Sequence, residues 1–284
     1  METIRTLDTI SFDALFTAFN EAFIDYEVQV NRDELQVMLS RRGFVPSLSF
    51  GLFEDSMLVS FTLNGIGEFN GEKTAYDTGT GTIKEYRGRG YASRIFMESL
   101  PSLRRAGVTQ YLLEVLQHNT KAVSVYRKLG FEEKREFNYF KQSCLMVNIP
   151  GKKLSPGYRI AEAVLEQVCD LKRFWDFAPS WQNSFDAIKR RTDDFKIFCS
   201  YKGNNIVGYI VFEPGSGDIT QLSVDKSHRR RGLASALLFR ALGYNRHDSV
   251  KAINTEISCT GITAFLESCG IVLRGKQFEM VKKL

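Results

Sequence analysis

Long apolar runs, cysteine pairs and histidine clusters are all missing from this 284-residue sequence. No stretch approaches the roughly 20 apolar residues of a membrane-spanning helix, and the N-terminal residues 1–5 contain neither an apolar core nor a cleavage-like site, so we expect no signal peptide. The five cysteines have no Cys-x-x-Cys spacing, and only three histidines are present: the cysteines are Cys144, Cys169, Cys199, Cys259 and Cys269. We therefore expect free thiols, a cytoplasmic location and no bound metal.

The charge balance argues against one class of protein, the nucleic-acid-binding modules. A net charge of +5 is modest, and the sequence has no dense stripe of basic and aromatic residues, which disfavours a nucleic-acid-binding module. With 43% hydrophobic and 25% charged residues, the composition is that of an ordinary globular protein. The length is comfortable for two domains, each able to bury its own core.

The most informative stretch runs from Thr82 to Ala92, between a strand pattern and a helix pattern. A helix start exposes unpaired N–H groups at the positive end of the helix dipole, and this arrangement binds phosphate. Gly88 and Gly90 allow the backbone to curl and to approach a ligand closely. Arg87 and Arg89 add charge of the right sign.

The same spacing returns in Arg229–Ala234, again between a strand pattern and a helix pattern. Gly232 follows Gly90 by 142 residues, half of the chain length. A repeat of this size predicts two similar domains. We expect a first domain at 1–148, a linker at 149–157 that is rich in proline, glycine and lysine, and a second domain at 158–284.

Hydrophobic spacing predicts a mixed α+β fold in each half, with a mostly antiparallel sheet flanked by helices. Helices are expected at 10–23, 31–41, 92–100, 119–129, 164–174, 184–191, 232–242 and 260–269, and strands at 3–7, 47–53, 57–64, 76–83, 110–115, 138–149, 159–161, 195–201, 206–213, 218–224, 252–257, 271–273 and 277–281. Pro101 is expected to end or kink its helix, and Asn64-Gly65 to form a turn. Gly79 and Gly81 indicate either a bulge that opens a slot or tight packing under a helix.

Three motifs together resemble the GNAT N-acetyltransferase superfamily. They are Arg87-x-x-Gly90-x-Ala92, the segment Leu112–Val115 followed by Asn119, and Tyr126-x-x-Leu129-Gly130-Phe131. The resemblance covers residues 45–145 well, and in the second half it depends on the loop Arg229–Ala234, the strand before it and the helix before Gly270. It implies a tandem acyltransferase that moves an acetyl group from acetyl-CoA to an amine by direct attack in a ternary complex.

The resemblance also assigns roles. Acetyl-CoA would lie against Thr82, Ile83, Lys84, Arg87, Gly88, Arg89, Gly90, Tyr91, Ala92 and Asn119 in the first half, and against Val224, Arg229, Arg230, Arg231, Gly232, Leu233 and Ala234 in the second. Tyr126 would be the general acid for the departing thiolate, which suits a phenol that is protonated at neutral pH. The general base is Asp77 or Glu114, and the sequence does not choose between them. No metal is implied.

The second half departs from this pattern, because Leu266 falls where Tyr126 lies in the first half. The first half is therefore expected to be catalytic and the second degenerate or supporting. Asn119 also fits a helix N-cap, Tyr126 a core position and His118 an exposed loop. Trp175, Trp181, Gln182 and Asn183 suit either an acceptor pocket or an interdomain contact.

The acceptor is expected to be a small-molecule or peptide amine, with no nucleic-acid or membrane partner, and the oligomeric state stays open. The competing function is a non-catalytic acyl-CoA-binding or sensor protein.

Overall fold

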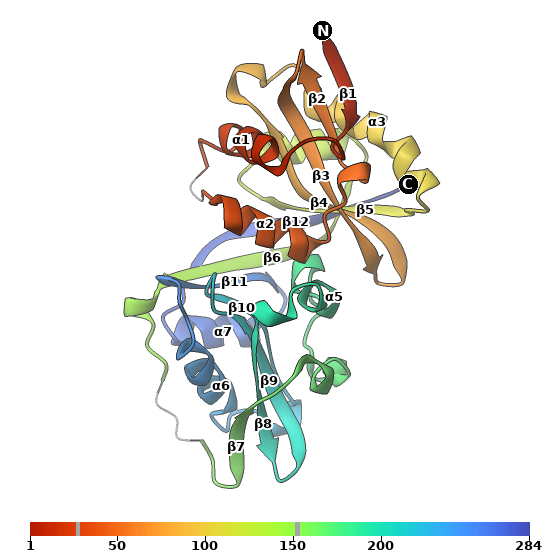
Figure 1. Ribbon diagram of the computed structural model, residues 1–284. Helices are drawn as coiled ribbons and strands as arrows, with labels where there is room; N and C mark the ends of the chain where they lie inside the picture. Colours follow the sequence, from red (N-terminus) through yellow and green to blue (C-terminus); the bar gives the residue numbers. More distant parts are fainter. Residues whose placement is uncertain (27–28, 151–153) are drawn as a thin grey trace. The chain divides into compact units, whose positions relative to one another are not determined.

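The computed structural model describes residues 1–26, 29–150 and 154–284 (Figure 1). Residues 151–153 of the expected linker lie outside the described residues. The chain forms two compact units. Unit 1 comprises Met1–Val115, Asn119–Lys134 and Glu279–Leu284, and unit 2 comprises Leu116–His118 and Arg135–Phe278. The expected domain ranges describe the sequence repeat and remain a prediction.

Unit 1 is a sheet with helices on both faces. Its elements are β1 (Glu2–Thr6), α1 (Phe12–Ala22), α2 (Arg32–Arg42), β2 (Phe50–Glu54), β3 (Met57–Phe69), β4 (Glu72–Thr82), α3 (Tyr91–Arg105), β5 (Gln110–Leu116), α4 (Thr120–Lys128) and the end of β12 (Leu273–Lys283). The strand order is β1-β2-β3-β4-β5-β12. Neighbours from β1 to β4 are antiparallel, and β4 pairs with β5 in parallel.

The two faces of this sheet bury different helices because successive strand residues point to opposite sides. Leu58, Phe61 and Leu63 of β3 pack with α1 and α2. Val59 packs with the start of α3 instead, because the β2–β3 register shifts between Leu52 and Phe53 and leaves Val59 as the extra residue of a bulge. Helix α1, within the range 10–23 expected from the sequence, packs on the sheet with Leu15 and Phe19 buried.

Unit 2 repeats this order. Its elements are β6 (Glu132–Ser143), β7 (Tyr158–Glu162), α5 (Phe185–Lys189), β8 (Lys196–Lys202), β9 (Asn205–Glu213), β10 (Asp218–Val224), α6 (Leu233–Leu242), β11 (Ser249–Glu256), α7 (Thr260–Ser268) and the start of β12. The strand order is β7-β8-β9-β10-β11-β6-β12. Here too one neighbouring pair, β10 with β11, is parallel, whereas β11 pairs with β6 antiparallel.

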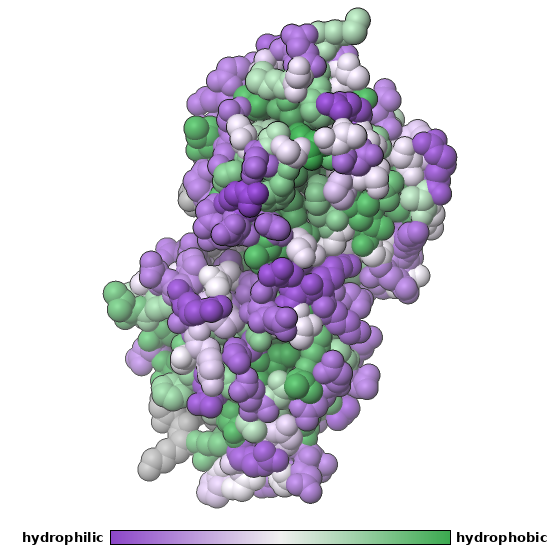
Figure 2. All heavy atoms as spheres, in the orientation of Figure 1, coloured by the Kyte–Doolittle hydropathy of each residue, from purple (hydrophilic) through white to green (hydrophobic). Residues whose placement is uncertain are grey.

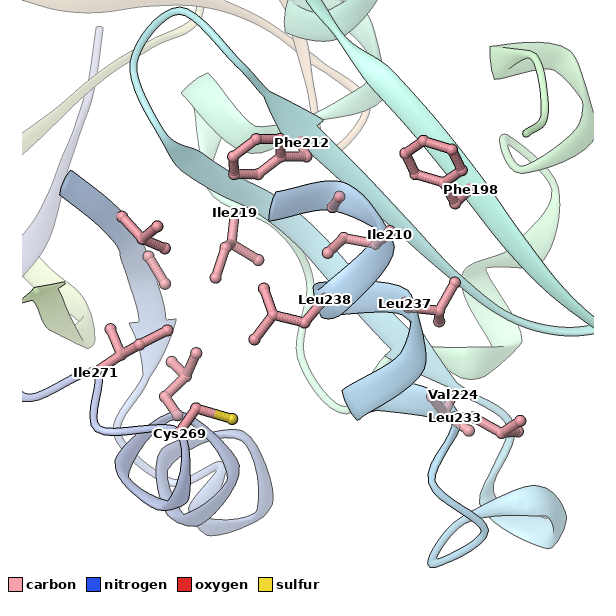
Figure 3. Close-up of a cluster of buried hydrophobic side chains, with 14 of the residues drawn as sticks. Phe198, Ile210, Phe212, Ile219, Val224, Leu233, Leu237, Leu238, Cys269 and Ile271 are labelled. Atoms are coloured by element: carbon pink, nitrogen blue, oxygen red, sulfur yellow. The ribbon is translucent and has the colours of Figure 1, made fainter. Parts of the chain in front are cut away.

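The core of unit 2 lies between α6, α7 and the sheet. Figure 3 shows Leu237 and Leu238 of α6 facing Ile210 and Ile219 of the sheet, with Cys269 at the end of α7. All five side chains are at most 5% exposed. On the surface, hydrophilic and hydrophobic residues are mixed on the face that Figure 2 shows. No helix in the described parts of the chain is long and apolar enough to cross a membrane.

The mixed α+β class is confirmed, but the closing strands differ from the expectation. The expected domain ranges place the strand at 138–149 in the first domain and the strands at 271–273 and 277–281 in the second. Instead β12, from the end of the chain, is the neighbour of β5, and β6, from the first half, is the neighbour of β11. Sequence pattern identifies a strand but carries no information about which edge it pairs with.

Three local expectations are wrong, for different reasons. Residues 164–174 form 3₁₀ turns at Leu165–Gln167 and Leu171–Phe174, because the buried positions 165, 168, 171 and 174 recur every three residues, the period of a 3₁₀ helix. Helix α3 continues past Pro101 to Arg105, with the buried Leu103 beyond the proline, so the expected end near residue 100 is wrong, whereas a kink at Pro101 stays a prediction. Asn64-Gly65 lies within β3 and is no turn.

Candidate active site

The Gly-rich loop of unit 1 connects β4 to α3. Gly88 and Gly90 have φ of 81° and 77°, a left-handed conformation that favours glycine, and a Cβ on either would meet no atom within 4 Å. Gly90 is the N-cap of α3 and provides no side chain to bond the first N–H groups. The first N–H groups of α3 therefore have no side-chain cap and lie at the positive end of the helix, an arrangement that fits a diphosphate.

The Arg87 side chain has a different task from the one its charge suggests. Its Nε donates to the Thr82 carbonyl at 3.2 Å, Nη1 bonds Asp25 at 2.8 Å, and Nη2 donates to the Ala22 carbonyl at 2.8 Å. Lys84 Nζ also bonds Asp25, at 3.1 Å. These contacts tie the loop to the end of α1, and the Arg87 backbone N–H donates to the Lys84 carbonyl at 3.2 Å, so Arg87 shapes the loop rather than facing a ligand.

Of the neighbouring residues expected to contact acetyl-CoA, some have side chains engaged within the protein and others face a cavity. Tyr91 is 4% exposed and its hydroxyl donates to Glu2, so only its backbone can face a ligand. Ala92 lines a cavity described below. Arg89 stacks on Tyr86 at 4.9 Å from the ring centroid.

Unit 2 builds its loop by the same contacts 142 residues later. Arg229 Nε donates to the Val224 carbonyl at 3.0 Å, and its guanidinium pairs with Asp176 at 2.9 Å. Gly232, with φ of 80°, precedes α6 as Gly90 precedes α3. Arg230 has φ of 64°, in the place of Gly88. The arginine of the motif is therefore a loop anchor in both units.

A cavity of about 500 Å³ opens in front of this second loop. It is lined by the end of β10, by the loop and by the small-residue face of α7, with Val224, Arg229, Arg230, Gly232, Leu233 and Ala234 among its residues. Arg231 is exposed beside it. The volume and the helix start suit an elongated anionic ligand.

In unit 1 the slot between β4 and β5 opens at a bulge. The two strands pair only at Thr74–Tyr76, and the β3–β4 register shifts by one residue between Leu63 and Asn64, opposite Gly79 and Asp77. A Cβ on Gly81 would lie 2.9 Å from Ala22 Cβ. The two alternatives for Gly79 and Gly81 therefore occur together: the bulge opens the slot, and α1 packs tightly on the glycines of β4.

Beyond the bulge lies a cavity of about 160 Å³. Its lining includes Asp77, Thr80 and Thr82 from β4, and Tyr126 from α4. Phe96, Tyr111 and Phe131 form an aromatic cluster at its wall, with Phe96 and Tyr111 edge to face at 5.1 Å. Asp77 is the one carboxyl group of this lining, which also includes the phenols of Tyr111 and Tyr126 and three threonines.

Asp77 and Tyr126 are hydrogen-bonded to each other. The Tyr126 hydroxyl donates to Asp77 Oδ2 at 3.2 Å, the Thr80 hydroxyl donates to the same oxygen at 2.8 Å, and the Gly79 N–H donates to Oδ1 at 2.9 Å. Burial raises the pKa of Asp77 to about 6, against these bonds. Burial and the Asp77 charge raise the pKa of Tyr126 well above its ordinary value, so this phenol stays protonated at neutral pH.

The structure separates the two candidate bases. Asp77 lines the cavity, whereas Glu114 accepts a hydrogen bond from the buried Tyr76 hydroxyl at 3.1 Å. A carboxylate with a pKa near 6 and a donor beside it can both take up and pass on a proton near neutral pH. Thr80 donates a further hydrogen bond to Asp77. It was not expected from the sequence, because no sequence signal separates it from the other threonines of β4.

The corresponding slot of unit 2 has no such pair. Its strands share one residue pair, Asp218 with Lys251, and the register shifts at Thr220. Ile219 and Leu266 occupy the positions of Asp77 and Tyr126, and both line a cavity of about 60 Å³. This slot can hold a ligand but offers neither side chain at those two positions for proton transfer.

The remaining candidates are placed as follows. Asn119 caps α4 by accepting from the Ala122 N–H at 3.2 Å, and its amide donates to the Tyr26 hydroxyl at 3.4 Å. His118 is exposed. Trp175 and Asn183 line the small cavity of unit 2, and Trp181 and Gln182 are buried near them in the chain. Among the described residues, no group of three His, Cys, Asp or Glu side chains could hold a metal ion.

Two curated proteins match part of this chain in sequence. N-alpha-acetyltransferase 30 of Schizosaccharomyces pombe is 37% identical over 59 residues, 20% of this chain and 39% of that protein. N-alpha-acetyltransferase MAK3 of Arabidopsis thaliana is 29% identical over 96 residues, 34% of this chain and 50% of that protein. The matched segments thus span half or less of these curated relatives.

Solved structures show the same fold over the whole chain. A GCN5-related N-acetyltransferase from Sphaerobacter thermophilus superposes with a TM-score of 0.75 at 14% identity, covering 99% of this chain and 95% of the other. A tandem GNAT protein from the clavulanic acid biosynthesis pathway gives 0.76 at 10% identity, covering 100% and 98%. The sequence profile described as "Acetyltransferase (GNAT) family" matches residues 12–131 and again 162–270. The chain therefore belongs to the acetyltransferase (GNAT) family, with one family match in each half.

Proposed function

We propose that the protein is an acetyl-CoA-dependent N-acetyltransferase whose chemistry takes place in unit 1. The observation that carries this proposal is the hydrogen-bonded pair of Asp77 and Tyr126 beside the Gly-rich loop. Family membership supports acetyl transfer to an amine in general. The relatives named as N-alpha-acetyltransferases favour a peptide α-amino group as the first acceptor to test.

Acetyl-CoA fits unit 1 by the open space in front of Gly88 and Gly90 and by the uncapped start of α3. The N–H groups of residues 88–92 would hold the diphosphate, Arg87 would fix the loop through its bonds to Thr82 and Lys84, and the edge of β4 at Thr82 would face the pantetheine arm. When bound, acetyl-CoA supplies an activated thioester. Unit 2 would bind a second CoA-like ligand through Gly232 and the start of α6, without catalysis.

Asp77 and Tyr126 together can account for the protons that move during acetyl transfer. Asp77 takes up the proton that the amine loses as the new C–N bond forms and the C–S bond breaks. Tyr126 gives its proton to the departing sulfur. The 3.2 Å hydrogen bond between them then lets a proton pass from Asp77 to Tyr126, which returns both groups to their starting state. One amine and one thioester give one amide and one thiol.

The test measures thiol release from acetyl-CoA with a panel of free-amino peptides and small primary amines, with N-terminally blocked peptides as the control. Tyr126→Phe and Asp77→Asn are expected to lower kcat roughly 100-fold or more with little change in CoA affinity. Leu266→Tyr in unit 2 is the matched variant, and it is expected to leave kcat unchanged.

Two results would contradict the proposal. Undiminished turnover in Tyr126→Phe and Asp77→Asn would move the chemistry away from unit 1. Calorimetric binding of acetyl-CoA with no thiol release across the panel would favour the non-catalytic sensor.

A further inference from the structure

The bulge of β4 leaves backbone groups that the sheet does not pair. Thr78 is the extra residue, since Asn64 pairs with Asp77 and Leu63 with Gly79. Its hydroxyl donates to the Leu63 carbonyl at 3.0 Å, and its own carbonyl accepts from Arg42 Nη1 at 3.0 Å. An unpaired buried carbonyl is costly, so the Arg42 contact helps to keep the bulge in this form.

Arg42 reaches the bulge because the end of α2 is fastened to β3 at the same level. Gly43 caps α2 in the left-handed conformation, with φ of 78°. The Val45 N–H donates to the Asn64 carbonyl and the Ile66 N–H to the Gly43 carbonyl, both at 2.9 Å. These bonds hold the last turn of α2 directly over the register shift.

Gly65 explains how a helix end can come so close to a strand. A Cβ at this position would lie 2.1 Å from the Arg42 carbonyl oxygen, an impossible approach. The absence of a side chain therefore allows α2 to contact the β3 backbone. The Asn64-Gly65 pair, which looks like a turn in the sequence, is a docking point for α2.

The charged and titratable groups around Asp77 come from four elements. Tyr76 lies beside it on β4, Tyr111 and Glu114 on β5, Tyr126 on α4 and Arg42 on α2. Within this set, Arg42 carries the positive charge. Its field favours the ionised form of Asp77 and opposes the effect of burial on the Asp77 pKa.

We propose that Arg42 is a positioning residue, which holds the β4 bulge through the Thr78 carbonyl and thereby aims the Asp77 carboxylate at Tyr126 and favours its ionised form. This inference rests on the proposed function, in which Asp77 is the base. Arg42 is not part of the cavity lining. Its influence on Asp77 is exerted through the Thr78 backbone and through its electrostatic field.

The test compares Arg42→Gln and Arg42→Lys with Arg32→Gln, which removes the same charge from the exposed start of the same helix, where Arg32 bonds Asp13. Two readouts are taken: the pKa of the Asp77 carboxyl by ¹³C NMR titration, and the pH profile of kcat with acetyl-CoA and the best peptide of the panel. Thermal unfolding of each variant checks its fold.

In Arg42→Gln the Asp77 pKa and the acidic limb of kcat are expected to rise together by about one unit, which by itself lowers kcat at pH 7 about twofold. The lost positioning should lower kcat severalfold more, to roughly tenfold in all, with the KM for acetyl-CoA within about twofold. Arg42→Lys keeps the charge, so the pKa should stay near that of the native protein, but kcat should fall severalfold because an ammonium lacks the planar reach of the guanidinium. Arg32→Gln should change neither readout.

A wild-type Asp77 pKa and a wild-type pH profile in Arg42→Gln would overturn the inference. If Arg42→Gln does not fold, wild-type kcat in Arg42→Lys would overturn it equally. Full activity of Asp77→Asn, with a raised Asp77 pKa in Arg42→Gln, would instead overturn the proposed role of Asp77 as base and leave the positioning by Arg42 intact.

Discussion

Replacing Asp77 with asparagine is expected to stabilise the protein at neutral pH while it removes activity. Burial raises the pKa of Asp77 to about 6, whereas an unfolded chain has the ordinary value of 3.8. The folded state therefore binds the proton more tightly, so the contribution of this group to stability is greatest below pH 3.8 and is lost as the pH rises through 6. At pH 7 the native carboxylate is charged in a site that favours the neutral form.

The magnitude follows from the difference of about two pKa units, which corresponds to an upper value of about 3 kcal/mol. Asp77 keeps some solvent exposure, so we expect about half of this, roughly 1–2 kcal/mol. For a chain of this size, that gain raises Tm by about 3–6 °C. Asparagine has the shape of the neutral acid, and its amide can bond Thr80 and Tyr126 in reversed polarity.

The assay is thermal unfolding of native protein and Asp77→Asn at pH 7 and pH 3.5. The Tm gain should be present at pH 7 and absent at pH 3.5, where both side chains are neutral. Glu72→Gln, at the start of the same strand, is the matched control, because an ion pair with Lys283 lowers the pKa of Glu72 and its loss should give no gain. Equal Tm values at pH 7, or a gain that persists at pH 3.5, would refute the argument that Asp77 is desolvated.

The same pKa sets a kinetic expectation. A base with a pKa near 6 is about 90% ionised at pH 7 and about 10% at pH 5, so kcat should fall roughly ninefold to tenfold over this range. A base with the ordinary pKa would give an almost flat profile. Saturating acceptor must be used, because a peptide α-amino group itself titrates near pH 8 and would shape kcat/KM.

Gly90→Ala and Gly232→Ala are each expected to lower the free energy of unfolding by about 1–2 kcal/mol, because both glycines have a positive φ. Titration calorimetry should show that each variant loses one CoA-binding site. Loss of both sites in either variant would contradict the view that the two loops bind independently. Arg230→Gly relieves a positive φ in a non-glycine residue and should stabilise unit 2 by about 0.5–1 kcal/mol in denaturant unfolding. Asn119→Ser should keep the cap on the Ala122 N–H, and Asn119→Ala should lose about 1 kcal/mol; an equal rise of the KM for acetyl-CoA in both would show that the Asn119 amide contacts the cofactor.

Local signals in the sequence were sufficient for the main elements. The helix expected at 31–41 is α2, which begins at the N-cap Asn31 with acids in its first turn. The loop spacing recurs with the same anchoring bonds at Arg87 and Arg229. Such features depend on residues near each other in the chain. The segment 164–174 misled because a spacing of three was taken for a helical period of 3.6.

The site was predictable only in part. The position of Tyr126 follows from its motif, but the choice of Asp77 over Glu114 needed the register shift that turns one of them into the cavity. Arg42 lies 36 residues from Thr78 and gives no sequence signal at all. Its role exists because Gly65 admits a helix end that only the packed structure brings there.

The sequence by itself determined the duplicated loop, the α+β class and the loss of the phenol at Leu266, because each is a property of short segments: a turn that needs glycine, a hydrophobic period, a side chain present or absent. Only the tertiary structure decided that β12 lies beside β5 and β6 beside β11, and that Asp77, Tyr126 and Arg42 surround one bulge. Strand order and proton-transfer geometry depend on contacts between residues far apart in the chain, whose free energy is gained only once the sheet has formed.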